Sequence, residues 1–307
     1  MVASLLTYYQ QLKLYNLHKK KFQGFNLYEP LMVFVGSSVN AVRNEGSKNV
    51  SDVVDVLLFL NEFLEGSDQS IDAIRSIIHG DSGLVDTKNS NIFDGAFIPL
   101  SEQFGHDNEA IYKDILKLVF GSMSADGGLI VENLSGVDGE IALRVGASDH
   151  FGLINVGDSS TLVKLCEENG LYTTDLQFSG SLFSEINEDH SPIKILIGSK
   201  KFTEGWNSWR VSTMGLMNVG RSEGSEIIQL FGRGVRLKGY NECLKRSRFA
   251  HAPHTPKSIE IVETLNVFGV RADYMRQFRE YLEEEGVKGI DDYEEIKLPC
   301  LRNFGSM

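Results

Sequence analysis

The chain has 307 residues, of which 42% are hydrophobic, so it is long enough for one large domain or two small ones with buried cores. No apolar run reaches the ~20 residues that span a bilayer, and no apolar N-terminal segment has the form of a signal peptide. The net charge of −12 argues against a protein that binds nucleic acid over most of its surface.

The basic residues are unevenly distributed. Residues 233–257 contain seven Lys or Arg and a single acid, Glu242. This segment predicts either a solvated basic surface or one nucleic-acid-binding face within an acidic protein. The cysteines are far apart and form neither a metal motif nor a disulfide framework, which predicts a reducing, cytoplasmic environment: Cys166, Cys243 and Cys300.

The first recognisable unit is a strand, a loop and a helix. Residues 31–35 form a short apolar run that predicts a buried parallel strand, and Gly36-Ser37-Ser38 follows it. Ser51 is positioned to cap a helix that runs to about Leu64, and Gly66 is positioned to stop it. This is the repeating element of α/β sheets.

Residues 67–151 have a different composition, rich in Gly, Ser, Asp and Asn, and are predicted to form an α+β insertion. Within or just after this stretch we expect a helix at 111–120, strands at 141–145 and 152–156, and a helix at 157–169.

The α/β pattern returns at residue 193. Strands are predicted at 195–197 and 213–219, with a polar loop at 199–210 between them, and Ser225 is positioned to cap a helix at 226–231. Residues 241–307 are predicted to begin a further, mostly helical region, with an amphipathic helix at 271–285.

The sharpest chemical signal is a pair of arginines three positions apart, Arg233 and Arg236, in the segment QLFGRGVR. Gln229 opens this segment, and Gly232 permits a close backbone approach. Planar guanidinium groups suit a transferring γ-phosphoryl group, whose charge spreads over three oxygens. The alternative is a helix end whose arginines simply match the helix dipole.

A second signal is the polar loop after the strand at 195–197. Thr203 and the Gly205 backbone could bind a nucleic-acid phosphate, Asn207 could reach a nucleotide, and the loop also carries Lys200 and Lys201. The alternative is an ordinary surface loop whose Trp206 packs into the core.

Together these two signals resemble a known family. Gly205 and Arg233 are 28 positions apart with a strand and a helix between them, which is the order and approximate spacing of motifs V and VI in superfamily-two helicases. The segment SKKFTEGWNSWRVSTMGLMNVGRSEGSEIIQLFGRGVRLKG resembles the restriction subunit of type III restriction enzymes, and VFVGSSVN with FLNEFL looks like its motif IV region. The stretches EIALRVGASDHFGLINVGD and ETLNVFGVRADYMRQFREYLEEEG are also similar to segments of that family.

The resemblance implies that residues 1–66 and 152–240 form the second RecA-like domain of an ATP-dependent DNA translocase. It implies that Arg233 and Arg236 meet the γ-phosphate and that Gln229, Gly232, Gly205 and Asn207 line the ATP site. DNA contacts would come from Thr203, Lys200, Lys201, Lys245, Arg246 and Arg248. The sequence departs from the family at Asn207, where the family commonly has Asp, and this puts any contact made by that carboxylate in doubt.

The sequence also lacks two parts of a complete ATPase. It contains no Gly-Lys dipeptide for a P-loop and no Asp-Glu dipeptide to hold Mg²⁺. The resemblance therefore implies that a first RecA-like domain, on the same or a companion chain, supplies the site for ATP and Mg²⁺. It also implies double-stranded DNA and a DNA methyltransferase subunit as partners.

Two other readings stay open. One is a stand-alone nucleic-acid-binding or docking module that has lost ATPase activity, and the other is a repair or transcription-linked helicase of the same superfamily.

Overall fold

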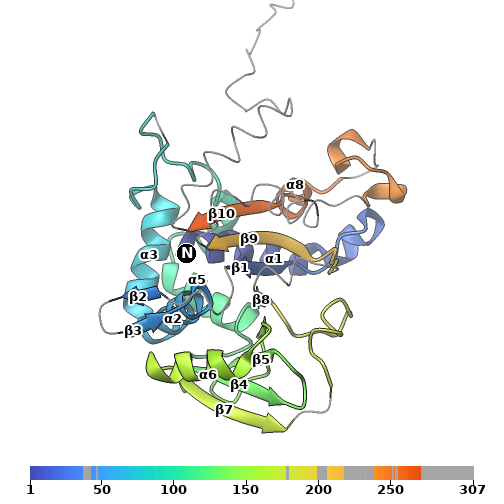
Figure 1. Ribbon diagram of the computed structural model, residues 1–307. Helices are drawn as coiled ribbons and strands as arrows, with labels where there is room; N and C mark the ends of the chain where they lie inside the picture. The colour runs from blue at the N-terminus through green and yellow to red at the C-terminus, as the bar shows by residue number, and fades with distance from the viewer. Residues whose placement is uncertain are drawn as a thin grey trace, which may run out of the picture.

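The structure, a computed structural model, describes residues 1–36, 43–45, 48–86, 88–177, 180–198, 206–217, 232, 238–250, 252 and 255–270. Its centre is an eight-stranded, mostly parallel sheet flanked by helices, so the predicted α/β class is confirmed (Figure 1). Among the described residues, no helix combines the length and the apolar character needed to cross a bilayer.

The strands lie in the order β10-β9-β1-β8-β6-β5-β4-β7. Five neighbours, β10 to β6, run parallel, β5 is antiparallel to both of its neighbours, and β4 and β7 are parallel to each other. Their bounds are β1 Leu31–Val35, β4 Leu129–Ser135, β5 Glu140–Val145, β6 Gly152–Asn155, β7 Tyr172–Gln177, β8 Ile195–Gly198, β9 Val211–Met217 and β10 Asn266–Val270. A separate antiparallel pair comprises β2 (Arg43–Glu45) and β3 (Lys48–Val50).

The three central strands are buried on both faces, as their apolar runs predict. Every residue of β1, β8 and β9 is buried. Side chains alternate between two clusters, so that Met32 and Phe34 join the helix-covered core while Leu31 and Val33 join the opposite cluster. Met32 pairs with Ile195, which places the two predicted strands side by side in one sheet. This part of the fold prediction is confirmed.

Helix α2 (Asp52–Glu65) begins and ends where its sequence signals indicate. The Ser51 hydroxyl accepts a hydrogen bond from the Val54 amide at 3.4 Å, which satisfies one of the free amides of the first turn. Gly66 is the C-cap residue, and its N–H donates to the Glu62 carbonyl. Helix α6 (Ser159–Glu168) is capped in the same way, because the Asp158 carboxylate accepts from the Thr161 amide at 3.0 Å.

The longest helix, α1 (Val2–Phe22), was not predicted. It crosses the helix-covered face of the sheet and contacts β9, α3, α5 and α8 (Figure 1). Its polar Gln11 is fully buried and donates to the carbonyls of Ile261 (2.8 Å) and Thr264 (2.7 Å). The Gln11 side-chain oxygen accepts from the Thr213 hydroxyl at 3.1 Å, so one buried amide joins α1 to β9 and to the end of α8.

Residues 67–151 do not sit apart as an insertion. They supply α3 (Ser67–His79), α4 (Ile98–Phe104) and α5 (Asn108–Leu118), and also β4 and β5 of the main sheet. Phe63 of α2 stacks on Phe120 at 5.9 Å, and Phe120 meets Phe151 edge-on at 4.8 Å, so this region shares the main core. The polar composition reflects its turns, while its apolar residues face inward.

The C-terminal region is described to residue 270 and contains a strand that was not predicted. Its described part contains two short 3₁₀ turns, η3 (Tyr240–Glu242) and η4 (Ser247–Phe249), and the short helix α8 (Ile259–Val262). It then contributes β10, which pairs in parallel with β9 as an edge strand. Val267 and Phe268 pack toward opposite faces of the sheet, which is the alternation of a strand. The predicted helices at 226–231 and 271–285 lie outside the described residues.

Candidate functional site

The carboxyl ends of five parallel strands meet at one edge of the sheet, which we call the carboxyl edge. Its end residues are Val35, Asn155, Gly198, Met217 and Val270. The Gly36 amide donates to the Gly198 carbonyl at 3.2 Å, which joins the ends of β1 and β8. In open α/β sheets, ligands bind outside this edge.

Gly36 lies where β1 meets the start of α2. A Cβ added at Gly36 would lie 2.6 Å from the Cβ of Asp52, so a side chain is excluded unless the helix moves. Asp52 and Asp55 occupy the first turn of α2. Two carboxylates there oppose the binding of a phosphate at this helix N-terminus, so the cations for such a ligand must come from other segments.

Most of the residues predicted to bind ATP or DNA lie outside the described residues. These are Gln229, Arg233 and Arg236 of the arginine segment, and Lys200, Lys201, Thr203 and Gly205 of the polar loop. The polar loop follows β8 in the chain, and the segment that leads to the arginines follows β9. Both strands end at the carboxyl edge.

Gly232 and Asn207 are the two members of the predicted ATP site that the structure describes. Gly232 is helical and exposed, and a Cβ added there would contact nothing within 4 Å, so packing within the chain does not require glycine. Asn207 is exposed, and its carbonyl accepts from the Asn187 side chain at 3.0 Å. The neighbouring Trp206 is buried and tilted against Phe183 at 6.3 Å, which confirms the packing alternative for this tryptophan.

The basic residues Lys245, Arg246 and Arg248 lie away from the carboxyl edge. Their segment lies beside the C-terminal end of α1 and the turn η1 (Gln23–Phe25), where the Asn26 side chain donates to the Gly239 carbonyl at 2.9 Å. This is the amino edge, where β1, β8 and β9 begin, and Figure 1 shows the orange segment there beside the blue end of α1. The structure therefore places these three predicted DNA-binding residues at the amino edge, and the other three lie outside the described residues.

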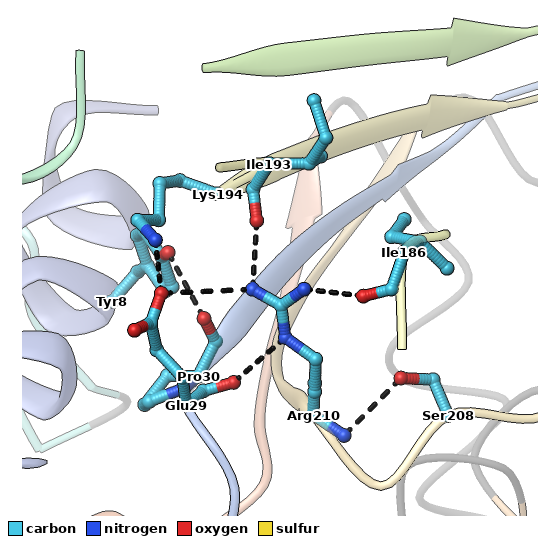
Figure 2. A network of polar contacts seen from close by, with 8 residues as sticks. All are labelled: Tyr8, Glu29, Pro30, Ile186, Ile193, Lys194, Ser208 and Arg210. Carbon is cyan, nitrogen blue, oxygen red and sulfur yellow. Dashed lines mark hydrogen bonds and ion pairs between the residues drawn. The ribbon is translucent and has the colours of Figure 1, made fainter. Parts of the chain in front are cut away.

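The amino edge also contains a buried arginine that the sequence analysis missed. The Arg210 side chain lies just before β9 and is only 4% exposed. Its guanidinium donates to the carbonyls of Glu29 (3.1 Å), Ile193 (2.7 Å) and Ile186, and Figure 2 shows these oxygens converging on it. A lone Arg between Trp209 and a buried strand was the sequence signal that could have identified it.

Two charged side chains complete this network. The Glu29 carboxylate lies 3.7 Å from the Arg210 guanidinium and also forms an ion pair with Lys194 (Figure 2). Tyr8 of α1 donates to the Pro30 carbonyl at 3.2 Å. Burial raises the pKa of Tyr8 well above its usual value, with Arg210 opposing and Glu29 adding to the shift, so its hydroxyl is a neutral donor. The network connects α1, the start of β1 and the 186–194 segment. The N–H and O–H donors of Arg210 and Tyr8 form their hydrogen bonds to groups of the protein itself.

A second buried charge lies in the other half of the sheet. Glu132 of β4 accepts from Arg144 at 2.8 Å and contacts His150 at 2.7 Å. Burial by itself raises the pKa of the Glu132 carboxyl, but the hydrogen bonds from Arg144 and His150 outweigh it, and the pKa lies below its usual value. In the part of the chain that the structure describes, no group of three or more His, Cys, Asp or Glu is arranged to hold a metal ion.

No protein-family model matches this sequence, and no significant match is found among curated proteins or among solved structures. The resemblance to type III restriction enzymes therefore stays a prediction drawn from the motifs.

Proposed function

We propose that this chain is the second RecA-like half of the motor of an ATP-dependent DNA translocase, of the type III restriction-enzyme kind. The observation that supports this proposal most directly is topological. The segments that contain the three motif-like sequences each follow the carboxyl end of one of the adjacent parallel strands β8, β1 and β9. Ligand sites of open α/β sheets occur at this edge.

In this proposal, ATP lies between the carboxyl edge of this chain and a first RecA-like domain. That partner holds Mg²⁺ and the phosphates, because this sequence has no Gly-Lys and no Asp-Glu dipeptide. When bound, the metal neutralises charge on the β- and γ-phosphate oxygens. Arg233 and Arg236 act across the cleft and stabilise the charge on the γ-phosphoryl oxygens as the bond breaks.

The remaining partners follow from the same proposal. Double-stranded DNA contacts the loop with Thr203, Lys200 and Lys201, and translocation brings the complex with its methyltransferase subunit to the point of cleavage. The carboxylates of Asp52 and Asp55 oppose binding of a phosphate at the start of α2, so in this proposal the γ-phosphate is bound by the arginines.

The test uses the complete motor, either the full protein or this chain with its companion, and measures ATP turnover, ATP affinity and DNA binding separately. Arg236→Ala is expected to lower kcat by about 10³-fold or more, which is the usual effect of losing an arginine finger. ATP affinity and DNA binding should change little, because the finger acts mainly in the transition state. Arg236→Lys should rescue little, because an ammonium cannot reproduce the planar fork.

The matched control is Arg75→Ala, which removes an exposed arginine of α3 that pairs with Asp72 three positions away. Its turnover should equal that of the parent motor. Near-normal turnover of Arg236→Ala would refute the motor assignment. ATP hydrolysis by the isolated chain would also refute it, because that result requires a complete nucleotide site within this sequence and favours a different enzyme class.

A further inference from the structure

Two basic segments that are far apart in the sequence meet at the amino edge. The first is the last turn of α1, where Lys19, Lys20 and Lys21 are all exposed. The second is the segment 238–250, whose basic residues are Lys238, Lys245, Arg246 and Arg248. We call these seven residues the amino-edge basic face.

The two segments pack on one shared hydrophobic cluster. Tyr15 and Phe22 of α1, Phe25 of η1 and Ile259 of α8 belong to one cluster, against which Tyr240 packs. The rings of Phe25 and Tyr240 are 5.4 Å apart. The two backbone segments that carry the basic side chains are therefore held at fixed positions relative to each other.

The turn that contains Arg246 and Arg248 is fixed by hydrogen bonds from a buried serine between them. Ser247 lies between Arg246 and Arg248 and is buried. Its amide and hydroxyl both donate to the Glu263 carboxylate, with the amide at 3.2 and 3.3 Å from the two oxygens. Arg246 and Arg248 on either side of Ser247 are exposed, and their own turn contains no acidic residue.

The charge of this face is opposite to that of the chain. Within residues 17–25 and 238–250 the sole acid is Glu242, which pairs with Lys238 at 3.3 Å, so the seven cations leave a net charge of +6 in a chain of −12. Other carboxylates adjoin the face: Glu263 accepts from Ser247, and Glu260 on α8 is exposed. Glu29, Glu188 and Asp189 line a small cavity with Lys19. Lysines at the end of α1 also match its dipole, but that role does not account for the second segment.

The face also carries exposed apolar groups between its cations. Leu244 is 77% exposed and Phe249 is 54% exposed. The Arg248 guanidinium lies 4.5 Å from the centre of the Phe249 ring. Such a pair offers a fixed cation for phosphate and a flat surface for a sugar or an unpaired base.

We propose that the amino-edge basic face binds the phosphate backbone of nucleic acid, as a contact surface separate from the carboxyl edge. The two edges are separated by the length of a central strand, about 23 Å for the seven residues of β9. The choice of nucleic acid over an acidic protein rests on the proposed function, but binding to this face needs neither ATP nor the arginines of the nucleotide site.

The test measures binding of a short labelled DNA duplex to the 307-residue chain by fluorescence anisotropy over a range of salt concentrations, without nucleotide. Two triple variants remove the two halves of the face: K19Q/K20Q/K21Q and K245Q/R246Q/R248Q. The plot of log K against log salt has a negative slope, and each lost phosphate contact should make it shallower by about 0.9. Each triple variant should therefore make the slope shallower by up to about 2.7.

The matched control is K113Q/K117Q/K164Q, which makes the same change in net charge at exposed positions of α5 and α6. Its slope should stay at the parent value. Equal losses in the control and the face variants would overturn the proposal, since binding would then follow net charge alone. All the substituted side chains are exposed, and single variants K20Q and R246Q keep the test valid if a triple variant unfolds.

Two further outcomes would also overturn it. Loss of binding in K200Q/K201Q, with both face variants unchanged, would place all DNA contacts on the loop after β8. Competition by polyglutamate as strong as that by unlabelled duplex would identify an acidic protein as the partner. The assay leaves Arg233 and Arg236 intact, so failure of the motor proposal and failure of this one are distinguishable.

Discussion

Replacing Arg210 should destabilise the whole amino edge. The Arg210→Met substitution keeps the length and the apolar stem of the side chain but removes every N–H that it donates. The carbonyls of Ile186 and Ile193 then lose their donor, and the Glu29 carboxylate keeps only Lys194 as a cationic partner. Because Arg210 is only 4% exposed, water cannot readily replace the hydrogen bonds that are lost.

The expected magnitude follows from these losses. A buried acceptor left without a donor costs about 1–3 kcal/mol, and breaking a buried ion pair from one side costs about 3–5 kcal/mol. Because Glu29 retains Lys194 and is only partly buried, the loss from the ion pair falls below that range. The two carbonyls then dominate, and we expect a total loss of about 3–5 kcal/mol in the free energy of unfolding. Arg210→Lys should recover part of it, since one ammonium cannot reach three carbonyls arranged around a planar fork.

The assay is urea unfolding followed by far-ultraviolet circular dichroism, with the midpoint and the slope compared between variants. Arg75→Met is the control, because Arg75 is 58% exposed and its pair with Asp72 is worth at most about 1 kcal/mol. If Arg210→Met unfolds at the same urea concentration as Arg75→Met, the network does not hold the amino edge together and the reasoning is refuted.

Two more predictions concern packing and pH. Gly36→Ala should destabilise the chain by about 1–3 kcal/mol in the same assay, because its methyl group would lie 2.6 Å from Asp52 Cβ. Gly24→Ala is the control and should not destabilise the chain, because a methyl group there meets nothing within 4 Å. Glu132 has a pKa below its usual 4.5, so its ion pairs stabilise the fold at neutral pH, and this contribution is lost as the pH falls through that lowered pKa. Glu132→Gln should therefore remove part of the acid sensitivity of the thermal midpoint, while the exposed Glu109→Gln leaves it unchanged.

A Gly36→Ala variant as stable as the parent would show that α2 can shift at no cost. For the carboxyl group, a Glu132→Gln variant whose acid sensitivity equals that of the parent would show that other groups govern the acid limb of stability.

The elements predicted correctly have signals that act locally. Ser51 and Gly66 delimit α2 because capping depends on a few neighbouring atoms, and the apolar run at 31–35 fits a strand buried on both faces. Helix α1 has no such signal, since buried side chains such as Leu5, Tyr8 and Gln11 surround it on several sides and leave no amphipathic stripe.

The errors in the sequence analysis all concern long-range partners. Composition describes residues 67–151 as polar, but does not reveal that β4 and β5 extend the main sheet. The segment NVFGV is short and contains Gly269, and only the neighbouring β9 makes it a strand. Likewise, the charges of Lys245, Arg246 and Arg248 are visible in the sequence, but their position at the amino edge is not. That position depends on contacts with α1 and the turn after it, more than 200 residues earlier in the chain. The hydrogen bond between Asn26 and Gly239, for example, spans 213 residues.

The order of strands in the sheet has a consequence for how the chain is made. β1 is synthesised early, but its neighbours come much later: the contact between Glu29 and Arg210 spans 181 residues, and that between Gln11 and Ile261 spans 250. At about 5–20 residues per second, the ribosome needs roughly 10–50 s to cover the longer interval. For most of that time the apolar strand LMVFV lacks both of its sheet neighbours, and α1 can pack only against earlier elements such as α3 and α5. The nascent chain therefore exposes apolar surface until its last strands emerge.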